Sequence, residues 1–264
     1  MAAGCEWGQG QFLKCMNVYD DPKYYDIAFS FRNILEEANF IEECIAKYSR
    51  TPVKTFLELA SGNSPHIEEL SSRGYGYVGL ELNSEMIRYA QQKIESLGCP
   101  AEIVRADMRQ FSLPASVDCA LVFLGSLYVA NDEELGEHLI SVARALRSGG
   151  LYILESVVEF YPEDVHTQTW NMERGTTKVS TTYEVTWLNR EEKILSGKII
   201  LDIDDAGTQK RIEHSEIRKI YSVKTFIERA EQTHQWEYVA ACSDFDLDQP
   251  PREGARNILV LRRR

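Results

Sequence analysis

Acidic and small residues recur at regular intervals between residues 58 and 107. Glu58 lies in a short apolar run that leads into the small residues 60–64, and Glu81 and Asp107 come at the ends of the next two apolar runs. Small residues between a strand and a helix let a ligand approach the backbone, and the first N–H groups of the helix are free to bind it. An acidic residue at the tip of the following strand suits hydrogen bonding to both hydroxyls of a ribose. The spacing therefore predicts a site for an adenosine-containing ligand.

The elements that position these residues follow from the hydrophobic pattern. Short apolar runs alternate with amphipathic stretches from residue 53 to about residue 157, which is typical of βαβ units around a parallel sheet. A helix is expected from Asn83 or Ser84 to Gly98, another over Asp132–Arg147, and a third with Pro65 as its first residue. The expected strands are Lys54–Leu59, Tyr77–Leu82, Ala101–Ala106, Val117–Leu124 and Leu151–Val157.

The amino-acid composition changes after this region. Three segments rich in Thr, Val, Ile and Tyr, separated by turn-like residues, predict an antiparallel meander inserted at about residues 165–221. These segments are Thr176–Trp187, Ile194–Ile203 and Ile212–Tyr221. A helix capped by Ser222 and two strands, Trp236–Ala241 and Asn257–Leu261, are expected to follow. Apolar residues at helical spacing between residues 26 and 48 predict an N-terminal helical lid over residues 1–50, ahead of a main domain over residues 51–264.

These residues resemble class I methyltransferases that depend on S-adenosyl-L-methionine (SAM). Glu58–Ser64 is similar to the family's acidic-x-Gly-x-Gly-x-Gly turn, Glu81 to its ribose-binding acidic residue and Asp107 to its adenine-contacting residue. Residues 79–86, residues 106–113 and the meander more narrowly resemble bacterial sugar N-methyltransferases and related small-molecule enzymes. The resemblance implies an α/β fold, with a Rossmann-like seven-stranded methyltransferase core, an antiparallel β sub-domain and an N-terminal helical lid, and it implies SAM as the cofactor.

The turn departs from the family at two of its three glycines. Ala60 is tolerable at the first position if its backbone keeps a negative φ, and Ser64 at the third is a possible helix cap. The turn alone is as compatible with an ordinary strand–helix connection as with a cofactor site. Together with Glu81 and Asp107 at successive strand ends, it favours a cofactor site. A nicotinamide-dependent reductase is disfavoured, because the missing glycines are those that tighten a turn around a pyrophosphate.

The resemblance implies contacts with each part of the cofactor. Glu58, Ala60 and Gly62 are expected at its methionine end, which Tyr25 covers and whose amino group the Leu124 carbonyl meets. Glu81 is expected to hold the ribose, and the adenine is expected between Leu82 and Met86, unless these two simply pack in the core. The cofactor contacts are thus Tyr25, Glu58, Ala60, Gly62, Glu81, Leu82, Met86, Asp107, Met108 and Leu124, with Asp107 and Met108 at the adenine edge.

The sequence indicates the residues of the acceptor side less specifically than those of the cofactor side. Methyl transfer needs an in-line approach, and a base is required only if the acceptor must lose a proton. His214 is the first choice for that base, although a lone strand histidine is often merely solvated, and Glu155 and Tyr25 are the other catalytic candidates. The acceptor-binding candidates are Tyr24, Ser126, Tyr128, Arg218 and Tyr221. Arg218 suits either an anion anchor or a strand-edge ion pair.

Composition narrows the class of partner. Lys and Arg total 29 against 41 Asp and Glu, a net charge of −12 that repels a nucleic-acid backbone. The six cysteines and five histidines show no metal-ligand spacing, and no apolar run is long enough for a membrane span. We therefore expect a cytoplasmic monomer or homodimer without a metal that methylates N or O of a small molecule. A protein methyltransferase and a non-catalytic SAM-binding protein are the alternatives.

Overall fold

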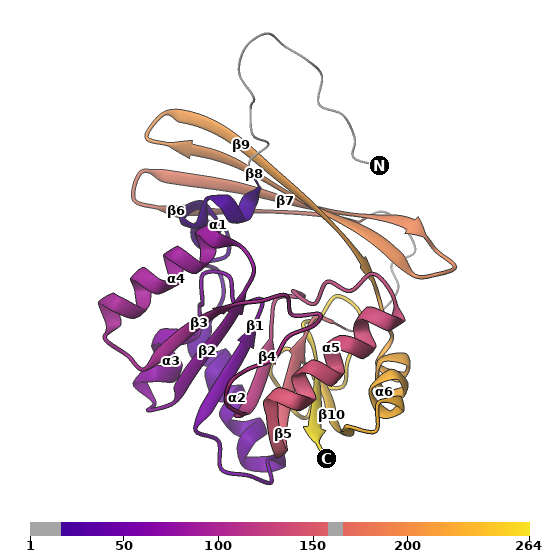
Figure 1. Cartoon of the computed structure of the whole chain (residues 1–264). Helices are drawn as coiled ribbons and strands as arrows, with labels where there is room; N and C mark the ends of the chain where they lie inside the picture. Colours follow the sequence, from indigo (N-terminus) through magenta and orange to yellow (C-terminus); the bar gives the residue numbers. More distant parts are fainter. Residues whose placement is uncertain (1–16, 158–165) are drawn as a thin grey trace.

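Two sheets lie one above the other in the computed structural model, which describes residues 17–157 and 166–264 (Figure 1). The core sheet has seven strands in the order β10-β11-β5-β4-β1-β2-β3, and the second sheet has four in the order β6-β7-β8-β9. The core strands are β1 (Thr55–Leu59), β2 (Gly76–Glu81), β3 (Ala101–Arg105), β4 (Val117–Val122), β5 (Leu146–Glu155), β10 (Trp236–Ser243) and β11 (Asn257–Arg263). The expected Rossmann-like core with a separate antiparallel sheet is confirmed.

The strand directions decide where ligands can meet the core sheet. β1 pairs in parallel with both β2 and β4, β4 pairs in parallel with β5, and β11 lies antiparallel to β5 and β10. The carboxyl ends of β1, β2 and β4 therefore meet at one edge, where ligands bind in open α/β sheets. The turn after β1, Glu81 and the segment after β4 all lie at this edge.

The helices around the core begin and end as their sequences indicate. α4 (Ser84–Leu97) is capped by the Asn83 side chain and ends at Gly98, whose φ is 60°. α2 (Ile34–Tyr48), α5 (Asp132–Ala145) and α6 (Val223–Gln232) are likewise capped, by Asn33, Asn131 and Ser222. α5 ends two residues earlier than expected, because β5 already begins at Leu146.

The second sheet consists of β6 (His166–Arg174), β7 (Thr177–Asn189), β8 (Ile194–Asp205) and β9 (Thr208–Lys219). Three of these strands correspond to the expected meander, and β6 is an additional edge strand that pairs with β7 from His166 to Arg174. Polar residues occupy most of β6, with only Trp170 and Met172 as large apolar side chains. The period-2 hydrophobic signal of a half-buried strand is therefore too weak to reveal it.

The N-terminal segment lies beside the second sheet. The short helices η1 (Val18–Asp20) and α1 (Pro22–Ala28) contact its strands, and Val18 and Ile27 pack in one cluster with Leu201. The Trp170 indole donates a 2.7 Å hydrogen bond to the carbonyl of Ala28. Only residues 18–28 of the lid expected over residues 1–50 thus lie against the meander, whereas α2 packs against the core sheet through Phe40 and Ile41. Residues 1–16 and the residues just before β6 are outside the described residues. None of the described helices is long and apolar enough to cross a membrane.

Candidate functional site

The turn after β1 has the backbone of a glycine-rich turn although it holds a single glycine. Ala60, Gly62 and Ser64 have φ values of 48°, 52° and 48°. The condition of a negative φ at Ala60 is therefore not met, and each non-glycine residue in this left-handed region costs about 1 kcal/mol. Ser64 does not cap a helix either, because α3 (Ile67–Ser72) begins three residues later, past Pro65, with His66 as its N-cap. All three family glycine positions keep the left-handed conformation.

Glu81 joins this turn to the end of β2. One carboxylate oxygen accepts a 2.8 Å hydrogen bond from the N–H of Gly62, and the other accepts 2.8 Å bonds from the N–H groups of Leu82 and Asn83. The carboxylate is partly exposed at the edge of the sheet. The turn of small residues and Glu81, which together suggested an adenosine site, are thus in direct contact.

The expected adenine contacts lie around the ends of β2 and β3. Leu82 is 54% exposed beside Glu81, whereas Met86 is fully buried, as its core-packing alternative requires. Arg109 hydrogen-bonds Asp107, and this lowers the pKa of the Asp107 carboxyl. Met108 packs against the core, and its carbonyl lies 2.7 Å from Nδ1 of His138. Leu82 is therefore the exposed member of this group, Asp107 and Met108 are half-buried, and Met86 is buried.

Glu58 lies in a buried charge cluster, which we define as Arg32, Glu37, Glu58, His66, Glu155 and Arg256. The His66 ring bridges two of its carboxylates, with Nδ1 2.7 Å from Glu58 and Nε2 2.9 Å from Glu37. Arg256 bridges two as well, at 3.1 Å from Glu37 and 2.8 Å from Glu155. Tyr77 donates a 2.5 Å hydrogen bond to the second oxygen of Glu58. Glu58 is therefore fixed on both oxygens.

The pKa values in the cluster follow from its three carboxylates and three basic groups. Burial raises the pKa of Glu58, but His66, Tyr77 and Arg32 outweigh this and lower it. Burial lowers the pKa of His66, yet Glu58 and Glu37 raise it above its usual value of 6.5. A protonated His66 balances the three carboxylates with three cations, so that the buried group as a whole is neutral.

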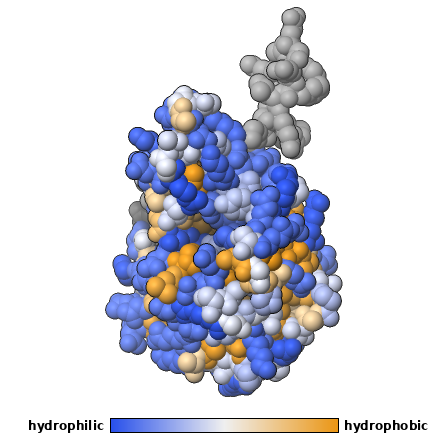
Figure 2. Space-filling model, turned by 90° about the vertical axis from the view of Figure 1, so that its left-hand side faces the viewer, coloured by the Kyte–Doolittle hydropathy of each residue, from blue (hydrophilic) through white to orange (hydrophobic). Residues whose placement is uncertain are grey.

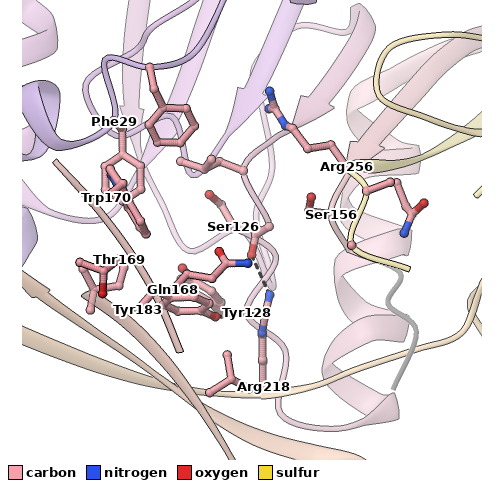
Figure 3. Close-up of a pocket in the computed structure, with 18 of the residues that line it drawn as sticks. Phe29, Ser126, Tyr128, Ser156, Gln168, Thr169, Trp170, Tyr183, Arg218 and Arg256 are labelled. Atoms are coloured by element: carbon pink, nitrogen blue, oxygen red, sulfur yellow. Dashed lines mark hydrogen bonds between the residues drawn. The ribbon is translucent and has the colours of Figure 1, made fainter. Parts of the chain in front are cut away.

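A cavity of about 870 Å³ separates the core from the second sheet, and we call it the acceptor cavity. Figure 3 shows Phe29 and Trp170 on one side of it and Arg256 on the other, with Arg218 reaching the Gly125 carbonyl at 3.3 Å. Its lining includes five of the predicted residues, namely Tyr25, Ser126, Tyr128 and Arg218 from the acceptor side and Leu124 from the cofactor contacts. It also includes Phe29, Phe31, Trp170, Tyr183 and Arg256, which the sequence did not single out.

The remaining predicted acceptor-side residues do not line this cavity. Glu155 accepts from the Leu124 N–H and from Arg256 in the charge cluster, which holds its carboxylate in place. Tyr24 donates to Asp205 at 3.0 Å, and Tyr221 donates to Asp132 at 3.0 Å. His214 packs against the ring of Tyr19, 4.8 Å between centroids, and burial lowers its pKa.

A small hollow beside the β1 turn opens toward the acceptor cavity. Tyr25, Leu124 and Ser126 line both spaces, and Glu58 and Gly62 line the hollow. The side chains fit the requirements of SAM: the Glu81 carboxylate for a ribose, left-handed turn backbone for close approach, and Glu58 beneath the end nearest the cavity. No group of three or more His, Cys, Asp or Glu in the described segments is arranged to hold a metal ion.

Residues 56–150 match the family described as a methyltransferase domain. The matched stretch is about a third of the chain, and it includes the β1 turn, Glu81 and Asp107. A dTDP-3-amino-3,4,6-trideoxy-alpha-D-glucopyranose N,N-dimethyltransferase of Streptomyces venezuelae is 29% identical over 140 residues, 52% of this chain and 56% of that protein. The putative methyltransferase YqeM of Bacillus subtilis is 27% identical over 114 residues, 40% of this chain and 46% of that protein. The chain thus spans about half the length of the curated relatives it matches.

Solved structures agree over a larger part of the chain. The sugar N-methyltransferase KedS8 from Streptoalloteichus has a TM-score of 0.73 at 19% identity, covering 100% of this chain and 99% of that one. SAM-bound CalS10, an amino pentose methyltransferase from Micromonospora echinaspora, has a TM-score of 0.71 at 16% identity, covering 98% and 100%. At these identities the likeness concerns the fold. Together with the match of residues 56–150 to a methyltransferase domain, these structures confirm the expected Rossmann-like methyltransferase fold.

Proposed function

We propose that this protein transfers a methyl group from SAM to an amine nitrogen of a small, ring-containing acceptor. The observation that carries the proposal is the junction of two spaces at the carboxyl edge of the core sheet. The hollow beside the β1 turn and the acceptor cavity share Tyr25, Leu124 and Ser126. A donor held in one space and an acceptor held in the other would therefore meet at these residues.

The chain's own residues supply binding and alignment. Glu81 would hold the ribose, Asp107 the adenine edge and Gly62 the methionine part of SAM, which supplies an electrophilic methyl group when bound. The charge cluster keeps Glu58 rigid, since His66 and Tyr77 occupy its two oxygens. Holding two reactants in a fixed orientation is a large part of catalysis in a transfer of this kind.

The side chains that line the acceptor cavity favour an acceptor that contains a ring and an anionic group. The ring centroid of Trp170 lies 5.7 Å from that of Phe29 and 5.9 Å from that of Phe31, an aromatic surface on which a sugar or a base can stack. Arg218 places a guanidinium group in the lining, whereas the charge of Arg256 is balanced within the charge cluster. One relative acts, by its name, on a dTDP-linked amino sugar. We infer a nucleotide-linked amino sugar as the acceptor class.

Calorimetric titration tests the cofactor half of the proposal. Wild-type protein should bind SAM and S-adenosylhomocysteine, and Glu81→Ala should weaken binding at least about tenfold, because a charge-assisted contact is lost. Glu95→Ala, an exposed change on α4, is the matched control and should bind normally. Absence of binding by the wild-type protein at millimolar ligand would refute the proposal.

Mass spectrometry of reaction mixtures tests the acceptor half. We expect methylation of dTDP-3-amino-3,4,6-trideoxyglucose and none of its 3-hydroxy counterpart. Methylation of basic peptides instead would favour a protein methyltransferase, and cofactor binding without turnover on any acceptor pool would favour a non-catalytic SAM-binding protein.

We further propose a cytoplasmic monomer or homodimer that does not bind nucleic acid. The net charge of −12 supports this part, since it opposes binding to a phosphate backbone. Gel filtration with light scattering, and a gel-shift assay at low salt, test the two statements separately.

A further inference from the structure

Glu216 is a buried carboxylate that has no hydrogen-bond partner in the described part of the chain and lies next to the acceptor cavity. It lies on the inner face of β9, 9% exposed, between His214 and Arg218 on the same face. In the described part of the chain, neither of its carboxylate oxygens has a hydrogen-bond partner. A buried carboxylate normally has such partners, because leaving it unpaired costs several kcal/mol. The exception points to a partner that is supplied from outside the chain.

The backbone of β8 makes room for this carboxylate. Gly197 pairs with Glu216 across the two strands. A Cβ at position 197 would lie 2.1 Å from Oε1 of Glu216 and 2.9 Å from the hydroxyl of Tyr183. Only glycine therefore allows the Glu216 carboxylate and the Tyr183 hydroxyl to lie together over β8. Since Tyr183 lines the acceptor cavity, the carboxylate lies directly behind the cavity wall.

The groups that face Glu216 come from five elements. They are His214 and Arg218 on β9, Tyr183 on β7, Tyr19 on η1, Tyr25 on α1 and Tyr128 in the segment after β4. Nε2 of His214 is 4.0 Å from the carboxylate, beyond hydrogen-bonding distance. Burial raises the pKa values of Tyr19, Tyr25 and Tyr128, so these hydroxyls stay neutral. Four tyrosine rings and one carboxylate are surroundings that suit an ammonium group, and Arg218 is the one permanently charged cation among the groups named.

We propose that Glu216 is the counter-charge for a protonated amine in the acceptor and receives the proton that this amine must lose. The inference rests on the proposed function and adds a reason why the methyl group would go to nitrogen and not to oxygen. In the step, one N–H bond of the ammonium group breaks and its electron pair stays on nitrogen. One O–H bond forms on the Glu216 carboxylate, which becomes neutral. The freed nitrogen lone pair is then the nucleophile for methyl transfer.

The ionisation of Glu216 suits this role. Burial raises its pKa to about 7, although Arg218 opposes the shift. A group with this pKa holds and releases protons readily at neutral pH. His214, the base expected from the sequence, is instead packed against Tyr19, and burial lowers its pKa.

Equilibrium binding is the first test. The S-adenosylhomocysteine complex is titrated with dTDP-3-amino-3,4,6-trideoxyglucose and with its 3-hydroxy counterpart, for wild-type protein, Glu216→Gln and the control Glu213→Gln. Glu213 lies on the outer face of β9 and pairs with Lys198, which makes it a matched control. The wild type and the control should prefer the amine at least about tenfold, and Glu216→Gln should lose the preference.

The pH profile of kcat/KM is the second test. Wild-type kcat/KM for the amine should rise as pH increases through about 7, where Glu216 ionises. Glu216→Gln should be slower at pH 7 by at least about tenfold and should recover as pH approaches the pKa of the free amine. Equal preference for both probes in the wild type, or an unchanged profile in Glu216→Gln, would overturn the inference and leave the proposed function intact. Cofactor binding without binding of either probe would count against both.

Discussion

Residues of the β1 turn keep the left-handed backbone conformation of the family turn even where they are not glycine. Ala60 and Ser64 occupy family glycine positions, yet both adopt a φ of 48° and keep the turn open toward the ligand edge. Glu81 explains how the turn is held, because its carboxylate accepts from the Gly62 N–H across two strands. The strain of the two left-handed residues is thus offset by hydrogen bonds from the neighbouring strand end.

Relief of this strain gives a stability prediction. Ala60→Gly should raise the free energy of unfolding by about 1 kcal/mol, because glycine adopts a positive φ without steric cost. Ala46→Gly, at an exposed position of α2, should lower it by about 1 kcal/mol through the ordinary helix penalty. Urea denaturation of both variants measures the two effects. Equal destabilisation by the two changes would contradict a strained turn.

At the level of elements, the second sheet determines the shape of the acceptor cavity. Figure 2 shows mainly hydrophilic surface over the upper part of the molecule and hydrophobic patches on the core below it. The inner face of the sheet carries Trp170, Tyr183, Val185, Ile199 and Arg218, all of which line the cavity. Because these residues alternate with outward-facing ones, a shift by one residue in pairing would remove the cavity wall.

A substitution at Gly197 tests how closely the backbone of β8 approaches the Glu216 side chain of β9. Gly197→Ala should lower the free energy of unfolding by about 1–3 kcal/mol, because the added methyl group meets the Glu216 carboxylate at 2.1 Å. Gly136→Ala in α5, where nothing lies within 4 Å, should instead stabilise the protein by about 0.5–1 kcal/mol. Thermal unfolding monitored by circular dichroism compares them. A neutral Gly197→Ala would mean that the carboxylate moves aside at no cost.

Local sequence patterns predicted the cofactor edge better than the acceptor side. Glu58, Gly62 and Glu81 lie within 24 residues of one another, and their spacing in a βαβ unit places them at one edge. The partners in the charge cluster are far apart in sequence, with Arg256 219 residues from Glu37. No periodicity connects such residues, and tertiary packing alone brings them together. The same holds for Glu216, whose role depends on Gly197 of another strand.

For the whole molecule, buried ionisable groups make stability depend on pH in two opposite ways. The charge cluster favours the protonated form of His66, because Glu58 and Glu37 raise its pKa above 6.5. His138 is equally buried but lies between the Met108 carbonyl and the Tyr152 hydroxyl, and burial lowers its pKa to about 4. Folding thus favours the cationic form of His66 and the neutral form of His138.

The signs of the two contributions follow from linkage. The folded state binds the His66 proton more tightly than the unfolded chain, so its stabilisation is complete below pH 6.5 and is lost as pH rises through the folded pKa. The folded state rejects the His138 proton, so stability falls as pH decreases from 6.5 to about 4. The Glu37 and Glu58 pKa values, both lowered, add a further loss below about pH 4.5.

Substitution of each histidine separates the two contributions. We expect His66→Gln to lose the decline in stability above pH 6.5, and His138→Gln to keep that decline but lose the slope between pH 6.5 and about 4. Urea titrations at half-unit pH intervals give the free energy of unfolding that decides this. Both variants lose buried hydrogen bonds and are less stable at every pH. The comparison therefore uses the slope of the free energy of unfolding against pH, not its absolute value. An unchanged alkaline slope in His66→Gln would show that His66 is neutral in the folded protein and that the charge cluster carries a net negative charge beneath the methyl-donor site.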